Sequence, residues 1–296
     1  MAAPEFVVLA AAFEKLTQAV RERGWNRVRV LQSGRNGGYG AGNNFGVRQG
    51  LPDGSSPDYI YILNSDAFPE PGAIRVLAEY LDAHPRVGFA GSRLHGEDGA
   101  YHQTAFRFPT VFSEFETAAA TGPISRLLRR YIVALPESNE VQEVDWLAGA
   151  SLMVRHRVFE ETGGFDERFF LYYEEVDLCR RMRAAGLQVH YWPELKATHI
   201  GGASARTVAQ AQVSKSGSQL ERWRMRSALL YYRKQHGPVA AALVHALERG
   251  WHRLRQLKAR LQGRDGCAAA FDAHCRQLAQ AWHDTAGGQR CPARPW

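Results

Sequence analysis

Cysteine is scarce in this sequence of 296 residues, and no two cysteines form a Cys-x-x-Cys pair; the four are Cys179, Cys267, Cys275 and Cys291. That spacing excludes the common zinc and thiol-redox motifs and fits a reducing cytoplasm. Long hydrophobic runs are also missing. The apolar run from Phe6 to Phe13 is too short to cross a bilayer and has no basic lead-in, so we predict neither a transmembrane helix nor a signal peptide.

A complete dinucleotide fingerprint is absent as well. Gly38-x-Gly40 begins the pattern G-x-G-x-x-G, but Asn43 stands where the third glycine belongs, which argues against a dehydrogenase. The net charge of +7 predicts an anionic partner, such as nucleotide phosphates, nucleic acid or an acidic membrane surface. Nucleic-acid binding rests on this charge alone, because the sequence has no recognisable binding module and no basic stripe interleaved with aromatic residues.

Short apolar runs alternate with helical patterns up to about residue 200, and this alternation predicts an α/β fold with a mostly parallel central sheet. We expect strands at 28–31, 59–63, 87–90, 144–154 and 187–191, and helices at 43–49, 71–83, 155–162 and 174–185. The composition changes after Ala205. We therefore divide the chain into a catalytic domain, 1–205, and a helical C-terminal extension, 206–296.

Two helices are predicted in the C-terminal extension. A capping-box pattern at Ser218–Glu221 begins the first, and Gly237-Pro238 ends it. The second runs to about Gln262, and basic residues lie over the surface that its apolar residues leave. The apolar residues fall on one side at helical spacing: Leu243, Leu247, Trp251, Leu254, Leu257 and Leu261. Either an anionic membrane surface or the catalytic domain could cover these helices.

A polar turn follows the buried strand at 59–63. Asn64-Ser65-Asp66 stands at its carboxyl end, where open α/β sheets place their ligands. A carboxylate there can hold Mg²⁺ or Mn²⁺ against a diphosphate, although a polar turn that caps the next helix is the alternative. The glycine-rich turn at 36–44 also opens a helix, and its glycines would let the backbone approach a phosphate.

Three carboxylates, Glu174, Glu175 and Asp177, begin a predicted helix after a run of aromatic residues. They suit the helix dipole as simple capping charges. Adjacent carboxylates beside aromatic residues also raise one another's pKa, which suits a general base. Because Asp177 and Arg181 are four residues apart and should pair, Glu174 and Glu175 are the freer groups.

Two further residues follow predicted strands or lie within them. His199 could be a second ligand for an ion such as Mn²⁺, although a lone histidine is more often a surface or core residue. Trp146 could line a sugar-binding cleft through its indole face, and ordinary core packing is the alternative.

Taken in order, six segments resemble the family 2 glycosyltransferases, in particular their rhamnosyltransferase-like branch. They are 36–44, 63–66, 145–150, 163–170, 174–181 and 199–202, so the resemblance covers about residues 26 to 236. It implies a GT-A-type nucleotide-diphospho-sugar transferase fold, a nucleotide-sugar donor and a divalent metal, Mn²⁺ or Mg²⁺. Donor-binding residues would be Asn36, Gly38, Gly42, Asn43, Asn64, Asp66, Trp146 and Gly149.

The resemblance also implies roles. Asp66 matches the last residue of the family's DXD-type motif, with Asn64 in the first position, and His199 matches a late histidine that can complete the metal site. Glu175 matches the carboxylate assigned as base, with Glu174 as its rival. The implied reaction is an inverting transfer of a sugar, rhamnose by the branch resembled, to a polysaccharide or lipid-linked glycan. We expect the protein in the cytoplasm, attached peripherally to the inner face of the cell membrane.

The N-terminus departs from the family pattern. Members normally begin with a strand and a helix, then a second strand that ends in Asp-Asn-x-Ser-x-Asp and helps to hold the nucleotide. No Asp-Asn-x-Ser occurs before Arg35. We therefore expect the first strand and helix to be missing, and a catalytically impaired GT-A pseudoenzyme that acts as a binding or scaffold protein is the alternative function.

Overall fold

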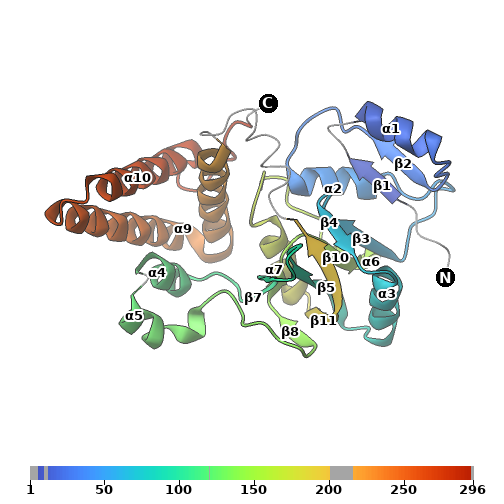
Figure 1. Cartoon of the computed structure of the whole chain (residues 1–296), viewed down its shortest axis with the longest axis horizontal. Coiled ribbons are helices and arrows are strands. Elements are labelled where there is room, and N and C mark those ends of the chain that lie inside the picture. Colours follow the sequence, from blue (N-terminus) through green and yellow to red (C-terminus); the bar gives the residue numbers. More distant parts are fainter. Residues whose placement is uncertain (1–5, 10–12, 120, 201–215, 295–296) are drawn as a thin grey trace.

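The computed structural model describes residues 6–9, 13–119, 121–200 and 216–294 of the chain. Within these ranges no helix combines the length and the apolar character needed to span a bilayer. Figure 1 shows a sheet-containing half and a half made of helices.

A small unit opens the described chain: β1 (Phe6–Leu9), α1 (Phe13–Glu22) and β2 (Val28–Leu31). The two strands pair in parallel and form a sheet of their own, as a strand–helix–strand unit does. A strand and a helix thus precede β2. Whether they are the family's second strand and its helix, with the first pair missing, stays a prediction.

The central sheet has seven strands. Its main path is β3 (Tyr59–Leu63), β10 (Ser151–Arg155), β5 (Val87–His95), β11 (Gln188–His199) and β4 (Ala67–Pro69). Short strands β6 (Tyr101–His102) and β8 (Gln142–Val144) pair with β5 and β11. Two more, β7 (Ala105–Phe106) and β9 (Trp146–Leu147), form a separate antiparallel pair.

The prediction of a mostly parallel central sheet is wrong, because most of its strands pair antiparallel. Only the pairing of β5 with β11 is parallel in the described central sheet, and the other pairings are antiparallel. The reason is β10, which lies between β3 and β5 and runs against both. Apolar runs reveal that a strand is buried but not which way it points.

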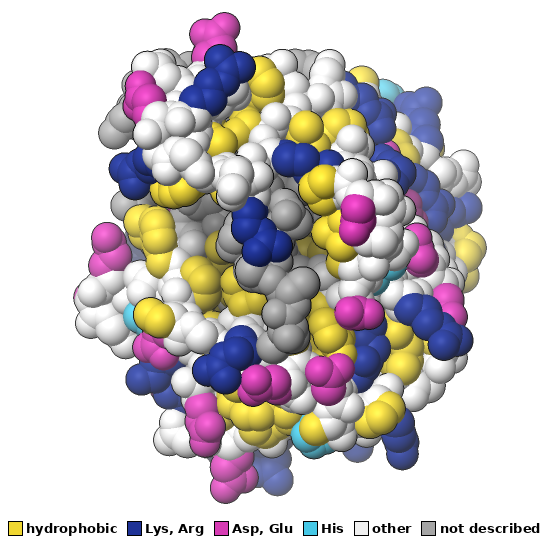
Figure 2. Space-filling model, turned by 90° about the vertical axis from the view of Figure 1, so that its right-hand side faces the viewer, with side chains coloured by type: hydrophobic (Ala, Val, Ile, Leu, Met, Phe, Trp, Pro, Cys, Tyr) yellow, Lys and Arg dark blue, Asp and Glu magenta, His cyan; other side chains and the backbone are white. Residues whose placement is uncertain are grey.

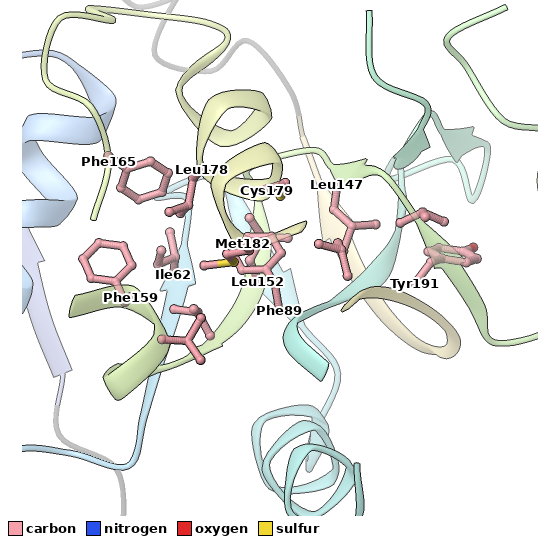
Figure 3. Packing of buried hydrophobic residues seen from close by; sticks show 14 of the residues in the cluster. Ile62, Phe89, Leu147, Leu152, Phe159, Phe165, Leu178, Cys179, Met182 and Tyr191 are labelled. Carbon is pink, nitrogen blue, oxygen red and sulfur yellow. The ribbon is translucent and has the colours of Figure 1, made fainter. Parts of the chain in front are cut away.

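Helices cover both faces of this sheet. On one face, α7 (Glu174–Ala184) and α6 (His156–Glu161) pack on side chains such as Phe89 and Leu152, and Figure 3 shows this cluster around Met182 and Leu178. On the other face, α3 (Ala73–Ala83) packs against Ala90 and Met153. Successive residues of a strand point to opposite faces, so β10 and β5 each contribute to both cores.

The C-terminal half is helical, as expected. Helix α4 (Val111–Ala119) packs beside α9, and α5 (Gly122–Leu127) lies next to α4. Helix α9 spans Ser216–Leu261 and breaks at Gly237 with φ 87°. The break confirms the predicted helix end at Gly237-Pro238. Helix α10 (Asp265–Thr285) was not expected, and it packs on α9 through Leu229 and Leu278. The proposed domain boundary at 205 falls outside the described residues.

Candidate active site

A cleft of 3040 Å³ opens beside the end strand β3 of the central sheet. It is lined by the glycine-rich turn that begins α2 (Tyr39–Arg48), by all of β3, by the β3–β4 turn and by Trp223 of α9. Figure 2 looks onto this side of the molecule and shows hydrophobic side chains around a hollow. Four of the six segments that carry the family resemblance thus contribute residues to the cleft: 36–44, 63–66, 163–170 and 199–202.

The β3–β4 turn holds Asn64, Ser65 and Asp66 at the cleft, where the sequence predicted a ligand. The amide of Asn64 donates to the carbonyl of Ala150 at 3.0 Å, and the amide of Ala67 donates to the carbonyl of Asn64 at 3.1 Å. These bonds fix the turn against the start of β10. Asp66 therefore stands on a rigid frame rather than on a free loop.

His199 lies next to Asp66 although 133 positions separate them in the sequence. Strand β11 pairs with β4 so that His199 stands opposite Ala67, which places Nε2 of His199 3.4 Å from Oδ1 of Asp66. Both side chains are largely buried and both line the cleft. No cluster of three or more histidine, cysteine or acidic side chains fit for a metal exists among the described residues.

The glycine-rich turn approaches the backbone before α7 closely. Gly38 has φ 89°, and a Cβ at this position would lie 1.9 Å from the carbonyl oxygen of Phe170. The next amide, that of Tyr39, donates to that same oxygen at 3.1 Å. Only glycine fits here, so this residue joins the start of α2 to the segment that leads into α7.

The other predicted donor-binding residues of this turn lie at the cleft as well. Asn36 accepts a bond from the amide of Gly38 at 3.1 Å, and Asn43 donates to the carbonyl of Tyr39 at 3.0 Å. Asn36, Gly42 and Asn43 line the cleft. The side chains of Asn36 and Asn43 are thus bonded to the backbone of the turn.

The acidic pair begins α7 directly after two residues of unusual backbone. Tyr172 has φ 69° and Tyr173 has φ 70°, a conformation that costs non-glycine residues free energy and gathers at functional sites. Helix α9 holds this turn, since Ser227 donates to the carbonyl of Leu171 at 2.8 Å. Glu174 and Glu175 therefore project from a strained and well-supported position.

Burial raises the pKa of both carboxyl groups. Desolvation raises the pKa of Glu175 to about 7, and hydrogen bonds from its own amide and from that of Gly149 oppose the rise. Desolvation and the neighbouring Glu175 raise the pKa of Glu174 well above its usual range. One oxygen of each carboxylate is buried without a hydrogen-bond partner. A half-buried Glu175 with a pKa near 7 suits a general base, whereas Glu174 is almost fully buried.

Tyr39 links the turn to the acidic pair, and sequence reasoning missed it. Its hydroxyl donates to the carbonyl of Gly149, whose amide in turn bonds Glu175. Burial, Glu175 and Glu174 raise the pKa of Tyr39 well above its usual value. Its position inside a run of glycines could have indicated a specific role, because a large aromatic side chain in such a turn needs a packing partner, here Phe165 at 5.8 Å between ring centroids.

Gly149 and Ala150 connect the two halves of the site. The amide of Gly149 bonds Glu175, and the carbonyl of Ala150 receives the amide of Asn64. Two residues of one segment thus touch both the acidic pair and the β3–β4 turn. The segment predicted to lie beside donor and acceptor stands between the two chemical groups of the site.

Asp177 is part of the support and not of the cleft. It is fully buried, pairs with Arg181 at 2.9 Å as predicted, and also pairs with Lys234 of α9 at 2.7 Å. Gln235 donates to it at 2.7 Å. These bonds hold α7 and α9 together.

Trp146 does not line the cleft in the described structure. Its ring stacks on Phe106 at 4.0 Å between centroids, and its indole N–H donates to the carbonyl of Arg107 at 2.9 Å. This is the packing alternative of the sequence analysis, because both its face and its polar atom are used. A role for Trp146 in donor binding stays a prediction.

The model of the glycosyltransferase-like family 2 matches residues 9–226 of this chain. Over 191 residues the chain is 32% identical to an N-acetylglucosaminyl-diphospho-decaprenol L-rhamnosyltransferase of Mycobacterium tuberculosis, a match that covers 62% of this chain and 61% of that protein. Over 200 residues it is 28% identical to the rhamnosyltransferase WbbL of Escherichia coli K12, covering 66% and 69%. The chain thus spans less than two thirds of the first of these relatives.

Among solved structures, GalNAc-T7 with UDP, GalNAc and Mn²⁺ aligns with a TM-score of 0.48 and 14% identity, over 75% of this chain and 44% of that one. Residues 1–349 of TarS from S. aureus align with a TM-score of 0.44 and 11% identity, over 98% and 85%. The family match and the α/β sheet with its C-terminal helices confirm the predicted fold class, GT-A-type, with the correction to strand direction given above. Because the family model covers residues 9–226, most of the sequence, this chain belongs to the glycosyltransferase-like family 2.

Proposed function

We propose that this protein is an inverting glycosyltransferase that moves rhamnose from a nucleotide-diphosphate donor to a polysaccharide or lipid-linked glycan acceptor. The observation that carries the proposal is the arrangement of two groups around one segment. Asp66 and His199 lie 3.4 Å apart at the cleft, and Gly149–Ala150 joins their turn to the Glu174–Glu175 pair. A transferase of this kind needs a diphosphate-binding edge and a base near each other.

The choice of sugar rests on relatives. Those in Mycobacterium tuberculosis and Escherichia coli K12 are named rhamnosyltransferases, and a third in Shigella flexneri, 23% identical over 220 residues, is named a dTDP-rhamnosyl transferase. The Mycobacterium enzyme is named for a lipid-linked acceptor, N-acetylglucosaminyl-diphospho-decaprenol. We take dTDP-rhamnose as the first donor to test.

Glu175 is the proposed base. Its raised pKa of about 7 lets it hold a proton taken from an acceptor hydroxyl, and it is less buried than Glu174, although neither residue lines the cleft in the described structure. The acceptor oxygen then attacks the anomeric carbon as the bond to the nucleotide diphosphate breaks. A single displacement of this kind inverts the anomeric centre, and its transition state has oxocarbenium character.

Asp66 and His199 fit a divalent cation. One carboxylate oxygen and one imidazole nitrogen, 3.4 Å apart at the mouth of a cleft, match the ligand types that Mn²⁺ accepts. A bound Mn²⁺ or Mg²⁺ would supply positive charge against the diphosphate that leaves. The chain's own contribution is a fixed turn, since Asn64 and Ala67 anchor it through backbone bonds.

We place the protein in the cytoplasm, attached peripherally to the inner face of the cell membrane, where a lipid-linked acceptor would be reached. Support comes from the acceptor in the Mycobacterium relative's name and from the basic charge of the C-terminal helices.

Calorimetric titration of dTDP, with and without Mn²⁺, tests the site. Asp66→Ala should remove the Mn²⁺-dependent part of dTDP binding and abolish transfer from dTDP-rhamnose. Asp265→Ala is the matched control, because that aspartate is exposed at the start of α10, away from the cleft. Binding of dTDP that does not depend on Mn²⁺ in the wild type would refute the metal site. Metal-independent binding without any transfer would favour the pseudoenzyme.

A further inference from the structure

The second part of α9, residues 238–261, turns its large apolar side chains to solvent. The most exposed of them range from 48% for Leu243 to 80% for Leu261, with Val239, Leu254 and Leu257 between. The face packed against the protein carries small residues instead, among them Ala240, Ala241, Val244 and Ala259. Of the six apolar positions predicted from the sequence, Leu243, Leu254, Leu257 and Leu261 face outward, whereas Leu247 and Trp251 are partly buried.

The position of the stripe follows from the contacts on the opposite side. Trp251 packs against Phe115 of α4 with ring centroids 6.0 Å apart, and Arg255 donates to the carbonyl of Ala119 at 2.8 Å. The ring of His252 stacks on that of His274 in α10 at 3.9 Å. These contacts occupy one side of the helix, so the leucine stripe has no cover among the described residues.

The stripe runs straight. Val239, Gly250 and Leu261 are exposed at intervals of eleven residues, and so are two further pairs in register with them, Leu243 with Leu254 and Ala246 with Leu257. Eleven residues turn a helix only about 20° beyond three full turns. The stripe therefore stays on one side for roughly 33 Å. This period excludes a left-handed coiled coil, which needs seven residues, and it suits either a flat surface or a right-handed helical partner, so the choice between these two rests on the charges beside the stripe.

The exposed charges of 238–261 that have no ion-pair partner among the described residues are basic, whereas Arg253 pairs with Asp272 of α10 at 3.0 Å. Arg249, Lys258 and Arg260 are exposed and pair with no carboxylate in the described part of the chain. The single acidic residue of 238–261, Glu248, points inward and accepts a bond from His274 at 3.1 Å. An apolar band bordered by unpaired cations is complementary to a bilayer that contains anionic lipids.

We propose that the outer face of residues 239–261 is the membrane-binding surface of this protein, with its leucines at the boundary between headgroups and acyl chains and its basic side chains at lipid phosphates. The inference deepens the proposed function, on which it rests for the choice of a membrane that carries acceptors. It identifies the surface that holds the cleft near that membrane.

Sedimentation with vesicles tests the surface without donor or acceptor. We expect the wild type to pellet at low salt with vesicles of phosphatidylglycerol and phosphatidylcholine, and to stay in solution with phosphatidylcholine alone. The double variant Leu254→Gln, Leu257→Gln should bind at least about tenfold more weakly, because two half-exposed leucines lose their apolar burial. Val141→Gln, at an exposed apolar residue of the sheet-containing half, is the matched control and should bind normally.

A triple variant, Arg249→Gln, Lys258→Gln, Arg260→Gln, should lose roughly a hundredfold in partitioning, at about fivefold for each basic residue. Transfer from dTDP-rhamnose to a water-soluble acceptor should be unchanged in all variants. Failure of the wild type to bind anionic vesicles would refute the proposed membrane-binding surface, even if transfer is normal. So would a wild-type dimer that the leucine variant converts to a monomer. Absence of transfer in solution refutes the transferase and leaves the sedimentation result standing.

Discussion

Glu175→Gln should strongly slow transfer and at the same time stabilise the protein. The carboxylate carries one buried oxygen without a hydrogen-bond partner, and burial raises its pKa to about 7 from an ordinary 4.5. A raised carboxyl pKa means that the folded state holds the proton more tightly than the unfolded state does. Its contribution to stability is therefore present below pH 4.5 and is lost as the pH rises through 7.

The size of the effect follows from these values. At pH 8 nearly the whole difference in proton affinity is felt, whereas at pH 5 little of it is. Removal of the ionisable group should thus raise the free energy of unfolding by about 2 kcal/mol more at pH 8 than at pH 5. For a chain of 296 residues this corresponds to a rise in Tm of about 3 °C. Loss of a general base should lower kcat by about 10²- to 10⁴-fold.

Urea unfolding at the two pH values and transfer assays with dTDP-rhamnose measure both effects. Glu194→Gln, at an exposed residue of β11, is the matched control and should change neither quantity with pH. Equal stabilisation of the Glu175 variant at pH 5 and pH 8 would refute the ionisation argument. Transfer within tenfold of the wild type would refute its role as base and move that role to Glu174.

Three further outcomes are expected. Gly38→Ala should lower the free energy of unfolding by at least about 3 kcal/mol in urea titrations, because the new Cβ would lie 1.9 Å from a carbonyl oxygen. The control Gly24→Ala, with φ 63° and no atom near the new Cβ, should lower it by only about 1 kcal/mol. Equal losses in the two variants would contradict the close approach. Asp177→Asn should cost about 3 kcal/mol in the same measurement, since it leaves the cations of Lys234 and Arg181 without their buried partner, and a loss below 1 kcal/mol would show that the network is dispensable. Tyr39→Phe should lower kcat while calorimetry finds dTDP binding intact, because its hydroxyl supports Gly149 beside Glu175; weaker dTDP binding with normal kcat would place Tyr39 at the donor instead.

The roles of the predicted site residues stay predictions, but the structure shows where each of them lies. Asp66 and His199 could be predicted from the ends of apolar runs, and the structure brings them to 3.4 Å. Glu174 and Glu175 could be predicted from the start of a helix. None of these patterns revealed Tyr39, because a hydrogen bond between positions 39 and 149 depends on tertiary packing.

The errors in the fold have physical reasons. Strand direction is set by connections, so β10 could not be recognised as antiparallel from Ser151–Arg155 alone. Helix α10 buries small side chains such as Ala268 and Ala281, whose weak hydrophobicity leaves little periodic signal. In α9 the periodicity was clear, but it cannot say whether a leucine stripe faces the core or the solvent.

The buried contacts of Asp177 make the C-terminal helices inseparable from the rest of the molecule. Lys234 and Gln235 of α9 supply part of the bonding of a carboxylate that has no access to water. A chain cut before α9 would keep that charge and lose those partners, at a cost of several kcal/mol. We therefore expect one cooperative unfolding transition for the whole chain, and we expect that an isolated N-terminal fragment will not fold on its own. Efforts to shorten this protein should begin at surface loops and leave α9 in place.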